Sequence, residues 1–149
     1  GKGVPTYLWS CLYKNVKISG KISGIQFKWQ LDPAQPYLDE DFQEDAKKFY
    51  ESIDLPLDIS EADFSTLLPI PGVPASKVVR NPEYHFIMSK TAAEKMLSDF
   101  QRYGIWAITA EELLDSGMDD MIVVIPSKGK SALKDKEEAD SLRELGLLT

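Results

Sequence analysis

Cysteine and histidine are almost absent from this chain of 149 residues, which holds one of each, Cys11 and His85. One cysteine cannot form an internal disulfide, and a zinc site needs three or four histidine and cysteine ligands. A chain of this length buries a sufficient core without such cross-links. We therefore expect no metal and no cofactor. The low cysteine content fits a cytoplasmic protein, and an exported protein whose N-terminal leader has been removed is the alternative.

Long apolar runs are also missing. No stretch approaches the roughly 18 consecutive apolar residues that a membrane-spanning helix requires. The sequence therefore predicts a soluble protein without a membrane partner.

The formal net charge of −7 is spread unevenly along the chain. Residues 1–31 hold five lysines and no acid, residues 32–63 hold eleven acids and two lysines, and residues 64–149 carry a net charge of −3. An exposed block as acidic as the second would repel nucleic acid and attract cationic proteins. The charge pattern therefore predicts a positively charged protein partner.

The first half of the chain predicts an aromatic-rich, antiparallel pair of strands. Apolar residues alternate with polar ones in TYLWSCLYK (6–14) and in IQFKWQL (25–31), which is typical of half-buried strands. The repeat KISGKISG between them is short and predicts a tight connection. In the second strand the aromatic residues face away from Lys28, which argues against a surface where nucleic-acid bases stack beside a bound phosphate.

The second half predicts alternating strands and helices. A helix is expected from Ser60 to Leu68, and three later strands are expected at YHFIM, IWAI and MIVVI, each followed by a helix. MIVVI is apolar without interruption, as in a central strand covered on both faces. The fold class is therefore α+β, as one domain over residues 1–149 with a mixed sheet.

Five acids lie within seven positions in the segment YLDEDFQEDAKKFY, residues 37–50. Apolar residues recur there at helical spacing, so the acids in the first turn could simply complement the helix dipole. A calcium loop is excluded, because counting from Asp39 the sixth residue is Glu44 and not glycine, and the twelfth is Tyr50 and not glutamate. Dipole complementation needs only one or two acids, whereas residues 32–63 hold eleven. A role in binding a partner is therefore the alternative. The candidate partner-binding residues are Asp39, Glu40, Asp41, Glu44, Asp45 and Glu51, with Tyr37 and Tyr50 as aromatic anchors.

Catalytic motifs are not found. Gly129-Lys130-Ser131 follows an apolar run, as in a phosphate-binding loop, but Val124 occupies the position that such a loop gives to glycine. An enzyme of the serine or cysteine hydrolase kind would have to use His85, in a cleft near the proline-rich segment PIPGVP. We therefore expect no catalytic residue, and we keep two alternatives, which are a small hydrolase-like enzyme and a structural component of a larger assembly.

Two segments carry a resemblance to a known family. PTYLWS near the start and YHFIMSKTAAEKMLSDFQRYGIWAI later together resemble the small immunity proteins of bacterial polymorphic toxin systems. That resemblance implies a non-enzymatic protein that binds and occludes a cognate toxin. An acidic surface suits a cationic toxin, so the resemblance and the charge pattern lead to the same expectation.

Overall fold

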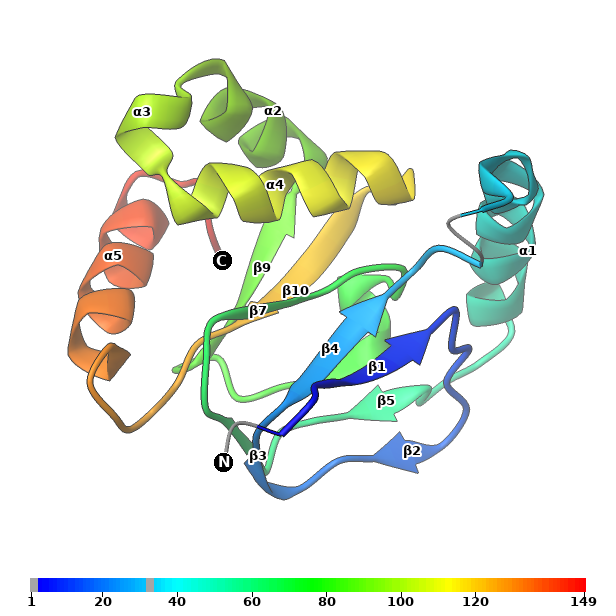
Figure 1. The fold of residues 1–149 in the computed structure, drawn as a ribbon, viewed down its shortest axis with the longest axis horizontal. Coiled ribbons are helices and arrows are strands. Elements are labelled where there is room, and N and C mark those ends of the chain that lie inside the picture. The colour runs from blue at the N-terminus through cyan, green and yellow to red at the C-terminus, as the bar shows by residue number, and fades with distance from the viewer. Residues whose placement is uncertain (1–2, 32–33) are drawn as a thin grey trace.

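The computed structural model describes residues 3–31 and 34–149, which form a mixed α+β fold (Figure 1). Its helices are α1 (Asp39–Glu51), α2 (Lys90–Ser98), α3 (Phe100–Tyr103), α4 (Ile105–Ser116) and α5 (Ala132–Glu144), with 3₁₀ turns at Pro36–Leu38 and Ala75–Lys77. Its strands are β1 (Thr6–Trp9), β2 (Val16–Lys17), β3 (Gly20–Ile22), β4 (Ile25–Lys28), β5 (Leu57–Asp58), β6 (Ala62–Phe64), β7 (Leu68–Ile70), β8 (Val78–Val79), β9 (His85–Ser89) and β10 (Asp120–Val124). The predicted α+β class is confirmed.

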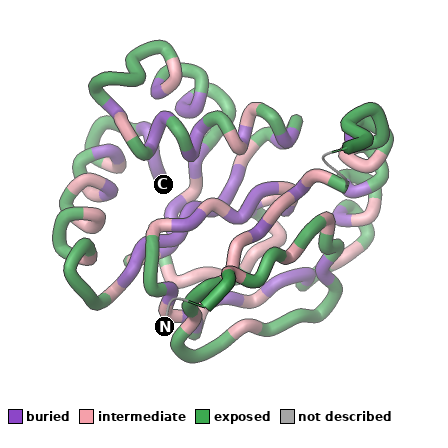
Figure 2. Tube along the Cα trace, viewed as in Figure 1, coloured by how far each residue is buried: buried purple, intermediate pink, exposed green. Residues whose placement is uncertain are grey.

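Strand β10 lies at the centre of the fold. It pairs antiparallel with β7 on one side and with β9 on the other. Met121 and Val123 pack into a core beneath the helices, whereas Ile122 and Val124 pack into a second core against the N-terminal strands. Figure 2 shows the buried residues running through this middle layer. The prediction of a central strand at MIVVI is confirmed, and the two cores share that strand.

The predicted antiparallel pairing of the N-terminal strands is wrong, because β1 and β4 are parallel, with Thr6 opposite Ile25 and Trp9 opposite Lys28. The connection between them is not a tight turn. It contains β2 and β3, which leave this sheet and pair in parallel with β5 and β6. The chain thus runs back along a second layer before it enters β4, and such a crossover returns a strand in the same direction.

Two further elements differ from the prediction. The segment from Ser60 to Leu68 forms a turn and the strand β6 instead of a helix. The run IWAI belongs to α4, where Trp106 and Ala107 are buried while Ile105 and Ile108 are exposed. A run of four apolar residues fits either a strand or one turn of a helix, so periodicity alone does not decide between them. Each helix within residues 3–31 and 34–149 is too short or too polar to cross a membrane.

Candidate protein-binding face

Helix α1 lies at one edge of the molecule, on the opposite side from α5 (Figure 1). It begins at Asp39, directly after the 3₁₀ turn that Pro36 opens, and no side chain caps its first turn. Ala46 and Tyr50 on its inner side are buried. These two residues are one helical turn apart, so they mark the inner side of α1, and the side chains on the opposite side point outward.

Five carboxylates on the outer side of α1 are exposed, and we call them the acidic face: Glu40, Asp41, Glu44, Asp45 and Glu51. The ion pairs formed among the described residues include none of the five. Two lysines, Lys47 and Lys48, are exposed on the same helix. The structure thus places five of the six predicted acids on the exposed side of one helix, with these two lysines one turn from Glu44 and Glu51.

The sixth acid, Asp39, is buried. Its Oδ1 accepts a hydrogen bond from the backbone N–H of Leu31, at 3.0 Å. This bond ties the start of α1 to the chain that leaves β4. Asp39 is therefore a positioning residue for the helix and lies outside the acidic face.

The two predicted tyrosine anchors lie in opposite environments. Tyr37 is 72 % exposed beside the start of α1, and its hydroxyl donates to the side chain of Gln35. Tyr50 is only 1 % exposed, and its hydroxyl accepts a hydrogen bond from the backbone N–H of Tyr13, at 3.1 Å. Burial raises the pKa of the Tyr50 hydroxyl. Only Tyr37 is placed to contact a partner, while Tyr50 belongs to the core.

The acidic segment 32–63 divides after α1, because its last acids are held by neighbouring groups. Glu61 pairs with Lys17 of β2 at 2.8 Å, and this hydrogen-bonded contact raises the pKa of Lys17. Asp63 accepts a hydrogen bond from the hydroxyl of Ser127. Hydrogen bonds from Ser60 lower the pKa of Asp58. Glu61 thus offsets a lysine of the basic N-terminal strands, and Asp58 and Asp63 are bonded to serines away from α1.

The C-terminal end of α4 adds acids that the sequence pattern did not single out. The side-chain amide of Gln43 on α1 donates to the backbone carbonyl of Asp115, at 3.1 Å. Gly117 ends α4 with a φ of +68°, and a Cβ there would lie 2.6 Å from Oε1 of Gln43, so glycine permits this close contact. Asp115 is exposed and, through this contact of its backbone with α1, borders the acidic face, while Glu111 is exposed one turn earlier on α4. Glu111 and Asp115 are four residues apart in the sequence, which places them on the same side of α4. That α4 ends beside α1 is shown only by the tertiary contact of Gln43.

The alternative of an enzyme depends on His85, which lies inside the core. It is 1 % exposed, and its ring contacts Phe64 edge to face. Its Nδ1 accepts a hydrogen bond from the backbone N–H of Asn81. Burial lowers the pKa of His85 to about 4, so the ring is neutral near pH 7. A general base must reach the substrate, and this imidazole is enclosed and already hydrogen-bonded.

Within the part of the chain that is described, no group of three or more histidine, cysteine or acidic side chains is placed to hold a metal ion. Cys11, the one free thiol, is exposed on the loop after β1. The geometry offers carboxylates for recognition, spread along a helix.

Comparison with protein families, with curated proteins and with solved structures finds no match to this chain. Function must therefore be inferred from the geometry and charge of its own residues.

The contrast between Asp39 and its neighbour Glu40 can be measured. Replacing Asp39 by alanine should lower the free energy of unfolding by about 1–2 kcal/mol, because the Leu31 N–H loses its acceptor. Replacing the exposed Glu40 by alanine should change it by less than about 0.5 kcal/mol. Urea denaturation of both variants tests this, with Asp39→Asn as the control that retains an acceptor. Equal, small losses for Asp39→Ala and Glu40→Ala would show that Asp39 does not position the helix.

Proposed function

We propose that this chain is a non-enzymatic binding protein whose acidic face contacts a positively charged protein. One observation carries the proposal, namely that Glu40, Asp41, Glu44, Asp45 and Glu51 stand exposed on one helix and that no described basic side chain forms an ion pair with them. Such a surface accelerates encounter with a cationic partner and supplies hydrogen-bond acceptors for lysine and arginine.

Helix stability alone does not account for the placement of these acids. Acids in the first turn, such as Glu40 and Asp41, complement the positive end of the helix dipole. Glu51 is the last residue of α1, and Asp115 lies in the last turn of α4, which contains no basic residue. Acids at those ends are unfavourable for the dipole. The presence of acids at these two helix C-termini supports a role in recognition.

The partner that fits this surface is a cationic toxin that the chain neutralises. Support for it comes from the acidic face together with the resemblance of PTYLWS and YHFIMSKTAAEKMLSDFQRYGIWAI to bacterial immunity proteins. Neutralisation of this kind requires no catalytic residue, only a surface complementary to the toxin.

Charge reversal tests the proposal. The triple variant Glu44→Lys, Asp45→Lys and Glu51→Lys changes three acids that all lie beyond the first turn of α1. Lysines there are tolerated by the helix dipole, so the fold should persist. We expect the triple variant to bind the cationic protein that copurifies with the chain from its native cells at least about tenfold more weakly.

A matched control separates the acidic face from net charge. Glu94, Glu137 and Glu144 are exposed on α2 and α5, and changing these three to lysine alters the net charge equally. This control should retain the copurifying protein at the wild-type level. If both triple variants lose it equally, or neither does, the acidic face is not the binding site.

A further inference from the structure

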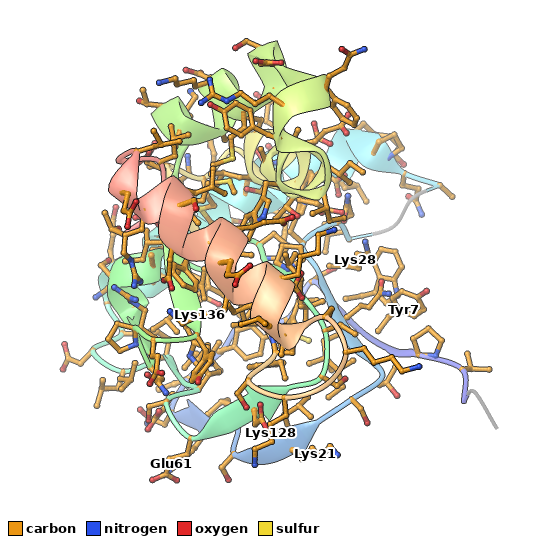
Figure 3. All side chains as sticks on the ribbon, turned by 90° about the vertical axis from the view of Figure 1, so that its left-hand side faces the viewer. Tyr7, Lys21, Lys28, Glu61, Lys128 and Lys136 are labelled. Atoms are coloured by element: carbon orange, nitrogen blue, oxygen red, sulfur yellow. The ribbon has the colours of Figure 1, made fainter. Side chains whose placement is uncertain are left out.

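The outer side of the β1–β4 pair carries two exposed aromatic residues. The parallel register places Tyr7 opposite Gln26 and Trp9 opposite Lys28, so these four side chains share one face, which we call the aromatic face. The alternate residues Leu8 and Phe27 pack into the core on the other side. Figure 3 shows Tyr7 and Lys28 projecting from the same side of the molecule. Phe27 of β4 does face away from Lys28, but Tyr7 and Trp9 of β1 do not.

The rings of Tyr7 and Trp9 lie beside each other at the surface, outside the hydrophobic core. Tyr7 is 42 % exposed and Trp9 is 41 % exposed, with ring centroids 5.9 Å apart and planes inclined by 33°. The other tryptophans, Trp29 and Trp106, are buried. Exposing a tryptophan beside a tyrosine leaves a large apolar area in water, and these two residue types are enriched among the residues that dominate binding energy at interfaces.

Polar contacts connect the aromatic face to the acidic surface. Nζ of Lys28 lies 3.3 Å from Oε1 of Glu112 on α4, so the positive charge of this lysine is offset. The second oxygen, Oε2, is enclosed and takes no hydrogen bond from any described residue. The helix α4 in turn contacts α1 through Gln43, and the backbone that leaves β4 is held by Asp39. The aromatic face therefore adjoins the carboxylate of Glu112 on α4, and α4 in turn contacts the helix that carries the acidic face.

We propose that the aromatic face binds an arginine side chain of the cationic partner, an inference that rests on the proposed function and names an anchor point for it. A guanidinium stacks on the faces of tryptophan and tyrosine, and it retains its charge in such a site. Asp115 on α4 is exposed and supplies complementary charge on this side. It lies one helical turn from Glu112, which contacts Lys28, and its neighbour Ser116 lines the same small cavity as Ser10, which follows Trp9. A lysine gains less, because its compact ammonium holds its water more strongly.

A nucleic-acid strand does not suit the same surface. Base stacking on Tyr7 and Trp9 would require cations for the phosphates, and Lys28 is paired with Glu112. The neighbouring carboxylates of α4 would repel the strand. The charge around the rings thus favours an arginine-bearing protein segment.

The experiment uses nuclear magnetic resonance of the full chain and follows its three indole N–H signals during titration. The probes are a short peptide of alternating arginine and glycine, the same peptide with lysine, and oligothymidylate. We expect the arginine peptide to shift the Trp9 signal and to leave the signals of buried Trp29 and Trp106 in place. The lysine peptide should bind more weakly, and oligothymidylate should shift nothing. An unmoved Trp9 signal with the arginine peptide, or a Trp9 shift with oligothymidylate, would overturn the assignment.

Variants show which groups carry the affinity. Trp9→Leu should weaken binding of the arginine peptide about fivefold, with Trp9→Phe intermediate. Phe100→Leu, at an exposed aromatic residue on α3, should leave it unchanged. An equal loss in Trp9→Leu and Phe100→Leu would contradict a specific site.

The two proposals fail in different ways. If the triple reversal at Glu44, Asp45 and Glu51 weakens binding of the copurifying protein but Trp9→Leu does not, the acidic face stands and the arginine site is wrong. If Trp9→Leu weakens it and the triple reversal does not, the arginine site stands and the acidic face is wrong.

Discussion

Replacing Tyr50 by alanine should lower the free energy of unfolding by about 3–5 kcal/mol, as for other large aromatic residues removed from a core. Tyr50 is among the largest fully buried side chains, and its ring packs edge to face against Phe49 at a centroid distance of 5.1 Å. Its removal leaves a cavity between α1 and the N-terminal layer. Urea denaturation, followed by circular dichroism, measures the loss.

Tyr50→Phe separates the ring from the hydroxyl. This variant keeps the packing but leaves the buried N–H of Tyr13 without its acceptor, so we expect a loss of about 1–3 kcal/mol. Tyr37→Ala serves as the comparison, because Tyr37 is exposed and its loss should change stability by less than about 0.5 kcal/mol. Equal effects of Tyr37→Ala and Tyr50→Ala on stability would contradict the assignment of Tyr50 to the core.

Lowering the pH from 6.5 to 4 should reduce the free energy of unfolding by up to about 3 kcal/mol through His85 alone. Burial lowers the pKa of His85 from its ordinary value of 6.5 to about 4 in the folded protein. Above pH 6.5 the imidazole is neutral in both states, and its contribution to stability is complete. Between these values the unfolded chain binds a proton that the folded chain does not, so stability falls as the pH falls.

His85→Gln isolates this effect, because His85 is the only histidine and glutamine can still accept the hydrogen bond from Asn81. Carboxylates also titrate at the acidic end of this range, and they do so in both proteins. The difference in unfolding free energy between wild type and His85→Gln, measured by urea denaturation at several pH values, should therefore shrink as the pH falls from 6.5 toward 4. A constant difference would mean that the imidazole is reached by solvent, which would restore His85 as a candidate catalyst.

Local sequence patterns predicted those strands and helices whose burial follows directly from the periodicity of their own apolar residues. The uninterrupted apolar run at 121–125 identified the central strand, and helical spacing identified α1 and α2. The parallel pairing of β1 with β4 could not be predicted in this way. It depends on β2 and β3 pairing with segments some 40 residues further along the chain, and alternation within a strand does not specify its partner.

The candidate site was predicted only in part, because local patterns do not show which side chains of α1 are covered by other parts of the chain. Composition identified the acids of α1, but nothing local distinguishes buried Asp39 from exposed Glu40, or buried Tyr50 from exposed Tyr37. Those differences arise from contacts with Leu31 and Tyr13, which lie in other layers. The exposure of Tyr7 and Trp9 could not be predicted, because strand alternation shows that two faces differ but does not show which one is covered.

The salt dependence of partner binding tests the central claim most directly. The dissociation constant of the copurifying cationic protein is measured by titration calorimetry at low and at high salt for wild type, for the reversal at Glu44, Asp45 and Glu51, and for the control at Glu94, Glu137 and Glu144. We predict that salt weakens binding strongly for wild type and control, and that the reversal binds at least about tenfold more weakly at low salt with a flatter dependence. The same affinity and the same salt dependence in all three proteins would contradict the account.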